Sequence, residues 1–169
     1  MPTIDLRHDI DCDEDTYWSK IVFDEAFNKD LFLKELGFPN WSVLASKDEG
    51  EKITRKVQVD PPVAGLPTAL KKVIGDKLSY VEEGTFDKKA KRYTFKVVPS
   101  TLADKTKVNG ELWTEKAGDK KTVRRCKISV EVKVFMVGSM VEERILEDLR
   151  VSYDKGAVYT NQWLAKNGG

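Results

Sequence analysis

The sequence contains few of the residues on which metal and covalent chemistry usually depend. It has one histidine, His8, and two cysteines, Cys12 and Cys126, among 169 residues. A single imidazole excludes metal sites that need two histidines and leaves few options for a histidine-based catalytic triad. The cysteine spacing fits neither a disulfide framework nor a Cys-x-x-Cys pair, which favours a reduced, cytoplasmic location.

Several sequence motifs are also missing. We find no glycine-rich phosphate loop and no Gly-x-Ser-x-Gly elbow, no apolar run near the roughly 20 residues of a membrane span, and no signal-peptide core at the start. The acidic run Asp9–Asp15 resembles a calcium loop only superficially. Glu14 stands where the EF-hand needs glycine, and Lys20 where it needs glutamate. We therefore predict no catalytic residue, no metal site and no cofactor.

Charge is nearly balanced overall, at +1, but it is unevenly distributed. Residues 1–51 are strongly acidic and residues 85–127 strongly basic. This polarity could steer a partner or an anionic surface, or the two segments could simply face each other or water. The length and the ordinary hydrophobic and charged fractions predict one globular domain spanning residues 1–169.

The periodicity of apolar residues predicts the order of the elements. Ile4 to Ile10 alternates as a half-buried strand, and two short helices follow, one capped by Asp13 and one over residues 24–36. A third short helix, 68–74, follows the proline-rich residues 60–67. Further strands are expected at residues 41–46, 52–59, 78–86, 91–98, 106–115 and 122–135. This order predicts an α+β domain with a mostly antiparallel sheet.

The last thirty residues predict one long amphipathic helix over 138–166. Ser139-Met-Val-Glu142 has the form of a capping box at its start. One face carries residues at three- and four-residue steps: Val141, Ile145, Leu149, Ser152, Tyr153, Gly156, Thr160 and Trp163. Because small and polar positions interrupt this stripe, we expect the helix to lie over a hollow.

The element order resembles the helix-grip arrangement of the START-like superfamily, which includes START lipid-transfer domains, the birch-pollen-allergen family and polyketide cyclases. Phe27–Phe38, and Cys126–Phe135 running into Met140–Glu143, look similar to the sterol-binding VASt-type branch. Val98–Ala103 departs from that branch's Pro-Tyr-Gly-like turn, and an uncharacterised bacterial START-like family fits equally well. The resemblance implies a curved seven-stranded antiparallel sheet wrapped around the C-terminal helix, with an apolar cavity between them.

Three charged residues, Arg55, Glu82 and Arg124, fall on inward-facing positions of the expected strands. Buried charges are costly unless paired, so an Arg55–Glu82 pair is expected. The pair could anchor a ligand hydroxyl or carboxylate, form a purely structural ion pair, or be turned to solvent by a β-bulge. The candidate ligand-binding residues are Arg55, Tyr80, Glu82, Arg124, Leu149, Ser152, Tyr153, Gly156 and Thr160.

Other residues have simpler interpretations. Tyr80 and Tyr153 could donate protons in a cyclase-like pocket or be packed aromatics with satisfied hydroxyls. We expect Cys126 to be an inert small hydrophobe and His8 a satisfied, half-buried side chain. No oligomeric state is indicated.

The sequence thus predicts binding, and possible transport, of a lipid-like or sterol-like molecule in the cavity. Basic segments Lys88–Arg92 and Lys120–Lys127, with the Pro61–Pro67 loop, could make transient contact with an anionic membrane or form a solvated face. They lack the interleaved exposed aromatics of nucleic-acid sites, so no nucleic acid is expected. A cyclase-like or hydrolase-like enzyme and a ligand-free protein-interaction module remain open.

Overall fold

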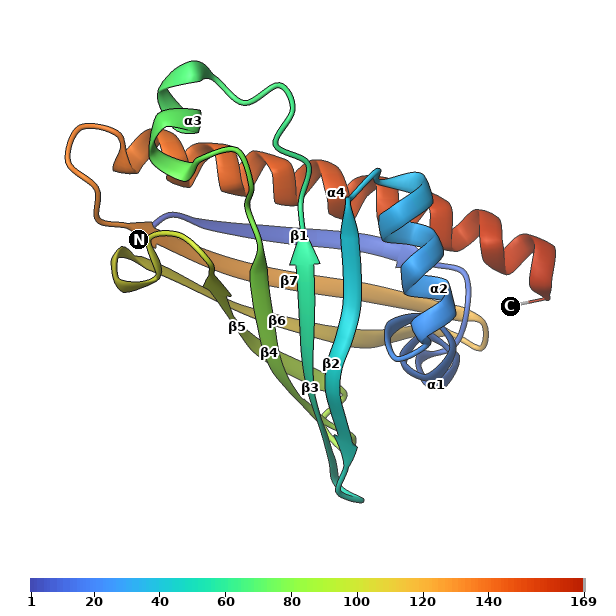
Figure 1. Cartoon of the computed structure of the whole chain (residues 1–169). Helices are drawn as coiled ribbons and strands as arrows, with labels where there is room; N and C mark the ends of the chain where they lie inside the picture. The colour runs from blue at the N-terminus through green and yellow to red at the C-terminus, as the bar shows by residue number, and fades with distance from the viewer. Residues whose placement is uncertain (169) are drawn as a thin grey trace.

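In the computed structural model, which describes residues 1–168, a curved seven-stranded sheet is covered on one face by a long helix (Figure 1). The strands are β1 (Thr3–Ile10), β2 (Asn40–Asp48), β3 (Lys52–Asp60), β4 (Tyr80–Asp87), β5 (Arg92–Pro99), β6 (Thr106–Gly118) and β7 (Lys121–Val132). Their spatial order is β1-β7-β6-β5-β4-β3-β2, and every neighbouring pair is antiparallel. The predicted α+β helix-grip fold is confirmed.

The helices occupy the positions that the sequence predicts. They are α1 (Glu14–Thr16), continued by a π-helical segment (Tyr17–Val22), α2 (Glu25–Lys29), continued by a second one (Asp30–Glu35), α3 (Thr68–Ile74) and α4 (Gly138–Asn167). Asp13 caps α1 by accepting from the Thr16 amide, as expected. Within the described residues, no helix is both long and apolar enough to cross a membrane.

Alternation along the strands decides which side chains enter the core. On β7, Cys126, Ile128, Val130 and Val132 are buried against α4, whereas Lys127 points to the outer face. Burying side chains of this size contributes about 1.5–3 kcal/mol each. The packing holds α4 across the concave face, with α2 near its C-terminal half and α3 near its start (Figure 1).

The junction between β7 and α4 differs from the sequence prediction. β7 ends at Val132 instead of Phe135, and α4 begins at Gly138 without a side-chain cap. The carboxylate of Glu142 accepts from the Val132 amide at 2.8 Å, so the predicted capping box does not form. A Cβ at Gly138 would clash with the Val132 carbonyl. This close approach of helix and strand determines where α4 starts.

The acidic and basic segments face each other near the turns that close β4–β5 and β6–β7. Lys121 lies 2.7 Å from Asp11, and Lys91 lies 3.7 Å from Glu14. The Pro61–Pro67 loop follows β3 at the opposite end of the sheet, beside α3 (Figure 1). The prediction that this loop lies beside the basic segments is therefore wrong, because antiparallel pairing sends the two features to opposite ends.

Candidate functional site

A cavity of about 310 Å³ lies between the concave face of the sheet and α4. Its volume is at the lower end of the range for small-molecule sites. The structure brings all nine predicted residues together on its wall: Arg55, Tyr80, Glu82, Arg124, Leu149, Ser152, Tyr153, Gly156 and Thr160. Their role in binding stays a prediction.

Most of the remaining wall is apolar and rich in aromatic rings. It includes Phe27, Leu31, Phe32, Phe38, Trp41, Phe95, Val108, Leu112 and Ile128. These side chains come from α2, the π-helical segment after it, the loop before β2, and the sheet. An apolar wall with a few polar groups is the usual composition of a small-molecule site.

The hollow exists partly because α4 presents little side-chain volume at its middle. Gly156 is buried, and a Cβ built there would meet only the Leu31 Cδ2 atom, at 3.8 Å. The Thr160 hydroxyl donates to the Gly156 carbonyl at 2.7 Å and so is already satisfied within the helix. Small side chains therefore leave room between α4 and the sheet.

Two strand glycines, missed by our sequence reasoning, allow aromatic rings to lie flat on the cavity floor. The ring of Tyr93 covers Gly84 on the neighbouring strand, and the ring of Phe95 covers Gly110. A Cβ at either glycine would collide with the ring above it. Glycine inside a strand is a known sign of close approach, so the signal was present in the sequence.

The predicted Arg55–Glu82 pair is present on the cavity wall. Arg55 Nη2 lies 3.9 Å from Glu82 Oε2, and this oxygen accepts from the Tyr93 hydroxyl at 3.0 Å. Arg55 Nη1 donates to the Val22 carbonyl at 2.8 Å. Burial raises the pKa of Glu82, while Arg55 and the Tyr93 hydrogen bond oppose the rise. The carboxyl therefore gains a proton more readily than an exposed glutamate.

A second polar cluster joins the sheet to α4 through Arg124. Arg124 Nη2 donates to His8 Nδ1 and to the Tyr153 carbonyl, both at 3.0 Å. A guanidinium only donates, so His8 carries its proton on Nε2 and donates to Asp154 Oδ1 at 2.7 Å. Burial lowers the pKa of His8. The hydrogen bond to Asp154 opposes this decrease, and the charge of Arg124 makes the decrease larger. The expectation of a satisfied, half-buried histidine is confirmed.

Burial favours the neutral forms of the cavity tyrosines and of Cys126 in the neighbouring core. Burial raises the pKa of Tyr80, and the charge of Glu82 adds to the effect. Burial likewise raises the pKa of Tyr153. It also raises the pKa of the Cys126 thiol to about 11. A thiol with so little thiolate is a poor nucleophile, which agrees with the expectation that Cys126 is inert.

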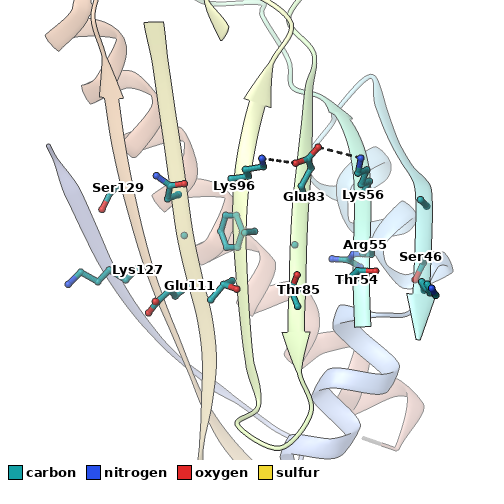
Figure 2. Close-up of a pocket in the computed structure, with 17 residues that line it drawn as sticks. Ser46, Thr54, Arg55, Lys56, Glu83, Thr85, Lys96, Glu111, Lys127 and Ser129 are labelled. Carbon is teal, nitrogen blue, oxygen red and sulfur yellow. Dashed lines mark ion pairs between the residues drawn. The ribbon is translucent and has the colours of Figure 1, made fainter. Parts of the chain in front are cut away.

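The outer face of the sheet carries a wider, shallower hollow of about 870 Å³ (Figure 2). Most of its side chains are polar, and Glu83 lies between Lys56 and Lys96, at 3.6 and 3.1 Å. Hydrogen bonding to Lys96 lowers the pKa of Glu83. Exposed pairs of this kind contribute little energy, and they satisfy one another. The inner cavity is therefore the stronger candidate site.

A curved antiparallel sheet that grips a C-terminal helix over an apolar cavity is the START-like fold. Residues 5–164 match the family described as "Protein of unknown function (DUF2505)", and the chain belongs to this family. The predicted likeness to an uncharacterised START-like family is thereby supported, whereas the finer resemblance to the VASt-type branch stays a prediction.

Solved structures share the fold at low sequence identity. TTHA0849 from Thermus thermophilus is 14% identical, with a TM-score of 0.69 over 99% of this chain and 100% of that one. Zhui aromatase/cyclase from Streptomyces is 10% identical, with a TM-score of 0.61 over 98% and 92%. A START superfamily protein from Mycobacterium smegmatis is 13% identical, with a TM-score of 0.55 over 93% and 97%. A search of curated protein sequences finds no match.

Proposed function

We propose that this protein binds, and carries, one apolar or amphipathic small molecule, such as a lipid or sterol, in the cavity beneath α4. The observation that carries the proposal is the concave apolar wall, rich in aromatic rings, among which only a few polar side chains lie. Transfer of apolar surface from water into such a wall is favourable at about 25 cal/mol per Å². The polar groups would orient the molecule and exclude poorly matched ones.

Filling the cavity from α4 tests this function. Replacing Gly156 by tryptophan places an indole where a Cβ alone meets only Leu31. We expect Nile red, an apolar dye, to bind this variant at least tenfold more weakly, a loss of about 1.4 kcal/mol. Fluorescence titration measures the affinity, and circular dichroism checks that the variant is folded.

The matched control is Val158→Trp, since Val158 lies on the exposed side of the same helix, 58% accessible. This variant should bind the dye as the wild type does. A folded Gly156→Trp protein with wild-type affinity would contradict binding in this cavity.

A cyclase-like or hydrolase-like enzyme is the second candidate, and Glu82 is the observation that favours it. Burial raises its pKa, so this carboxyl holds a proton more readily than an exposed glutamate, as a general acid requires. One solved relative in fold is described as an aromatase/cyclase. An enzyme would convert an added compound to product with a rate that titrates with Glu82, whereas a carrier would release its ligand unchanged.

Transient membrane contact would involve the loop between β7 and α4 instead of the basic hairpins. Phe135 and Met136 are 91% and 87% exposed there, and the Lys133 amide donates to the Lys105 carbonyl beside them. Apolar tips flanked by lysines suit an anionic bilayer surface. The loops at this end also contribute Leu102 to the cavity wall.

We expect the protein to sediment with vesicles of phosphatidylcholine and phosphatidylserine more than with phosphatidylcholine alone. The double variant Phe135→Ser/Met136→Ser should lose this difference, while Leu44→Ser, another exposed apolar site, should keep it. Equal sedimentation of all three proteins with both vesicles would argue against the contact.

A further inference from the structure

The buried charges on the cavity wall are unbalanced. Arg55 and Arg124 contribute two guanidinium groups, and Glu82, whose side chain is 23% exposed, is the carboxyl that lies next to Arg55. The other carboxylate on the described wall, Asp148, is exposed and paired with Arg144 at 3.0 Å. Because the pKa of Glu82 is raised, this carboxyl is a weak counter-ion for the two cations. The interior therefore carries an excess of positive charge.

One edge of the Arg55 guanidinium is not used by the protein. Nη1 donates to the Val22 carbonyl. Nη2 is 3.9 Å from Glu82, too far for a hydrogen bond. Nε is buried and has no hydrogen-bond partner among the described residues. Nε and Nη2 together form the side-on fork with which arginine binds a carboxylate through two parallel hydrogen bonds.

The surroundings hold this fork in a fixed orientation. The rings of Phe23 and Tyr93 lie 4.8 and 5.5 Å from the Arg55 guanidinium. The Arg55 side chain is only 9% exposed. A pre-oriented cation that is removed from bulk water binds an anion more strongly than an exposed one does.

Arg124 adds positive potential, and its Nε is likewise buried without a hydrogen-bond partner among the described residues, but the Nη2 beside it is already used. The Arg124 Nη2 group already donates hydrogen bonds to His8 Nδ1 and to the Tyr153 carbonyl. The nearest carboxylate in this cluster is Asp154, which lies on the far side of the imidazole ring. The charge of Arg124 is therefore only partly compensated where it faces the cavity.

We propose that the ligand is an amphipathic anion whose carboxylate binds side-on to Arg55 and whose apolar body lies along the aromatic wall. This inference rests on the proposed binding function and specifies its ligand class. The ligand carboxylate supplies the negative charge that the wall lacks, and it satisfies the buried Nε–H group. Tyr80 lines the same wall and can donate a further hydrogen bond.

Three ten-carbon probes that differ only in the head group test the proposal. Decanoate, decanol and decyltrimethylammonium are titrated separately into the ligand-free, full-length protein by isothermal titration calorimetry. We expect decanoate to bind at least about tenfold more tightly than decanol, and the cation to bind most weakly. Arg55→Met should bind decanoate and decanol equally. Lys56→Met, which removes a cation of the outer face on the same strand, should keep the wild-type preference.

Each outcome separates this inference from the proposed function. If decanol binds as tightly as decanoate, the anionic ligand class is wrong and the cavity still binds apolar molecules. Failure of all three probes and of Nile red would overturn both claims. A folded Arg55→Met protein that still prefers decanoate would exclude Arg55 as the contact. If the Arg55→Met protein does not fold, Arg55→Lys is tested in its place. Weaker decanoate binding with unchanged decanol binding would support the side-on contact with Arg55. Unchanged decanoate binding would overturn it.

Discussion

Replacing Gly84 by alanine is expected to lower the free energy of unfolding by about 2 kcal/mol, although it adds one methyl group. The new Cβ would occupy the position of the Tyr93 ring, so the ring must move away from the sheet. That movement breaks the hydrogen bond from Tyr93 to Glu82 and disturbs the stacking of Tyr93 on Phe95. The displaced ring would also enter the cavity and weaken ligand binding.

Urea unfolding of the variant measures the effect. Thr85→Ala, the next position on β4 with its side chain on the outer face, provides the control and should change stability little. Gly110→Ala repeats the test independently, because its Cβ would collide with Phe95. If both glycine variants were as stable as the wild type, the rings would not be fixed over the glycines as described.

Replacing Arg124 by methionine is expected to cost about 3 kcal/mol of unfolding free energy, since hydrogen bonds from a charged donor contribute about 1.5–3 kcal/mol each. Methionine keeps much of the side-chain length but leaves His8 Nδ1 and the Tyr153 carbonyl without their donor. These two contacts link β1, β7 and α4. Their loss should loosen the middle of α4, which hydrogen exchange of the amides near Tyr153 can detect.

The same variant should also alter the response to acid. The folded-state pKa of His8 lies below its unfolded value of about 6.5. The unfolded chain therefore takes up the proton first, and the stabilisation by neutral His8 is complete above pH 6.5. It is lost as the pH falls through the folded-state pKa, at up to about 1.4 kcal/mol per pH unit. Without the charge of Arg124, the pKa of His8 is lowered less and this loss becomes smaller.

Unfolding by urea at a series of pH values between 7.5 and 5 measures both effects. Arg125→Met is the matched control, because the neighbouring Arg125 is paired with Glu115 on the outer face, at 3.4 Å. The control should keep the pH dependence of the wild type. An Arg124→Met protein with wild-type stability and wild-type pH dependence would contradict the role given to this cluster.

The sequence predicted the cavity wall because period-two alternation assigns each strand residue to a face. Arg55, Glu82 and Arg124 could thus be placed inside without knowledge of strand pairing. The helical period did the same for Ser152 and Gly156 on α4. Both patterns involve residues close together in the sequence, so they can be recognised without knowledge of the tertiary structure.

Other features depend on pairing between distant segments and could not be derived in the same way. The covering of Gly84 by Tyr93 follows from the register of β4 against β5, which brings Gly84 opposite Phe95. The contact of His8 with Arg124 follows from the pairing of β1 with β7. The start of α4 at Gly138 was predicted, but its capping box was not found, because Glu142 accepts from the Val132 amide of β7 instead of capping the helix.

Native mass spectrometry of the protein as purified from cells tests the central claim, binding in the inner cavity, most directly. We expect a discrete adduct of lipid-like mass that disappears on denaturation, and organic extraction should recover an amphipathic molecule. The Gly156→Trp protein, prepared in parallel, should lack the adduct. A wild-type protein that shows only its polypeptide mass, and that takes up nothing from a lipid mixture, would contradict the claim and favour a protein-interaction module.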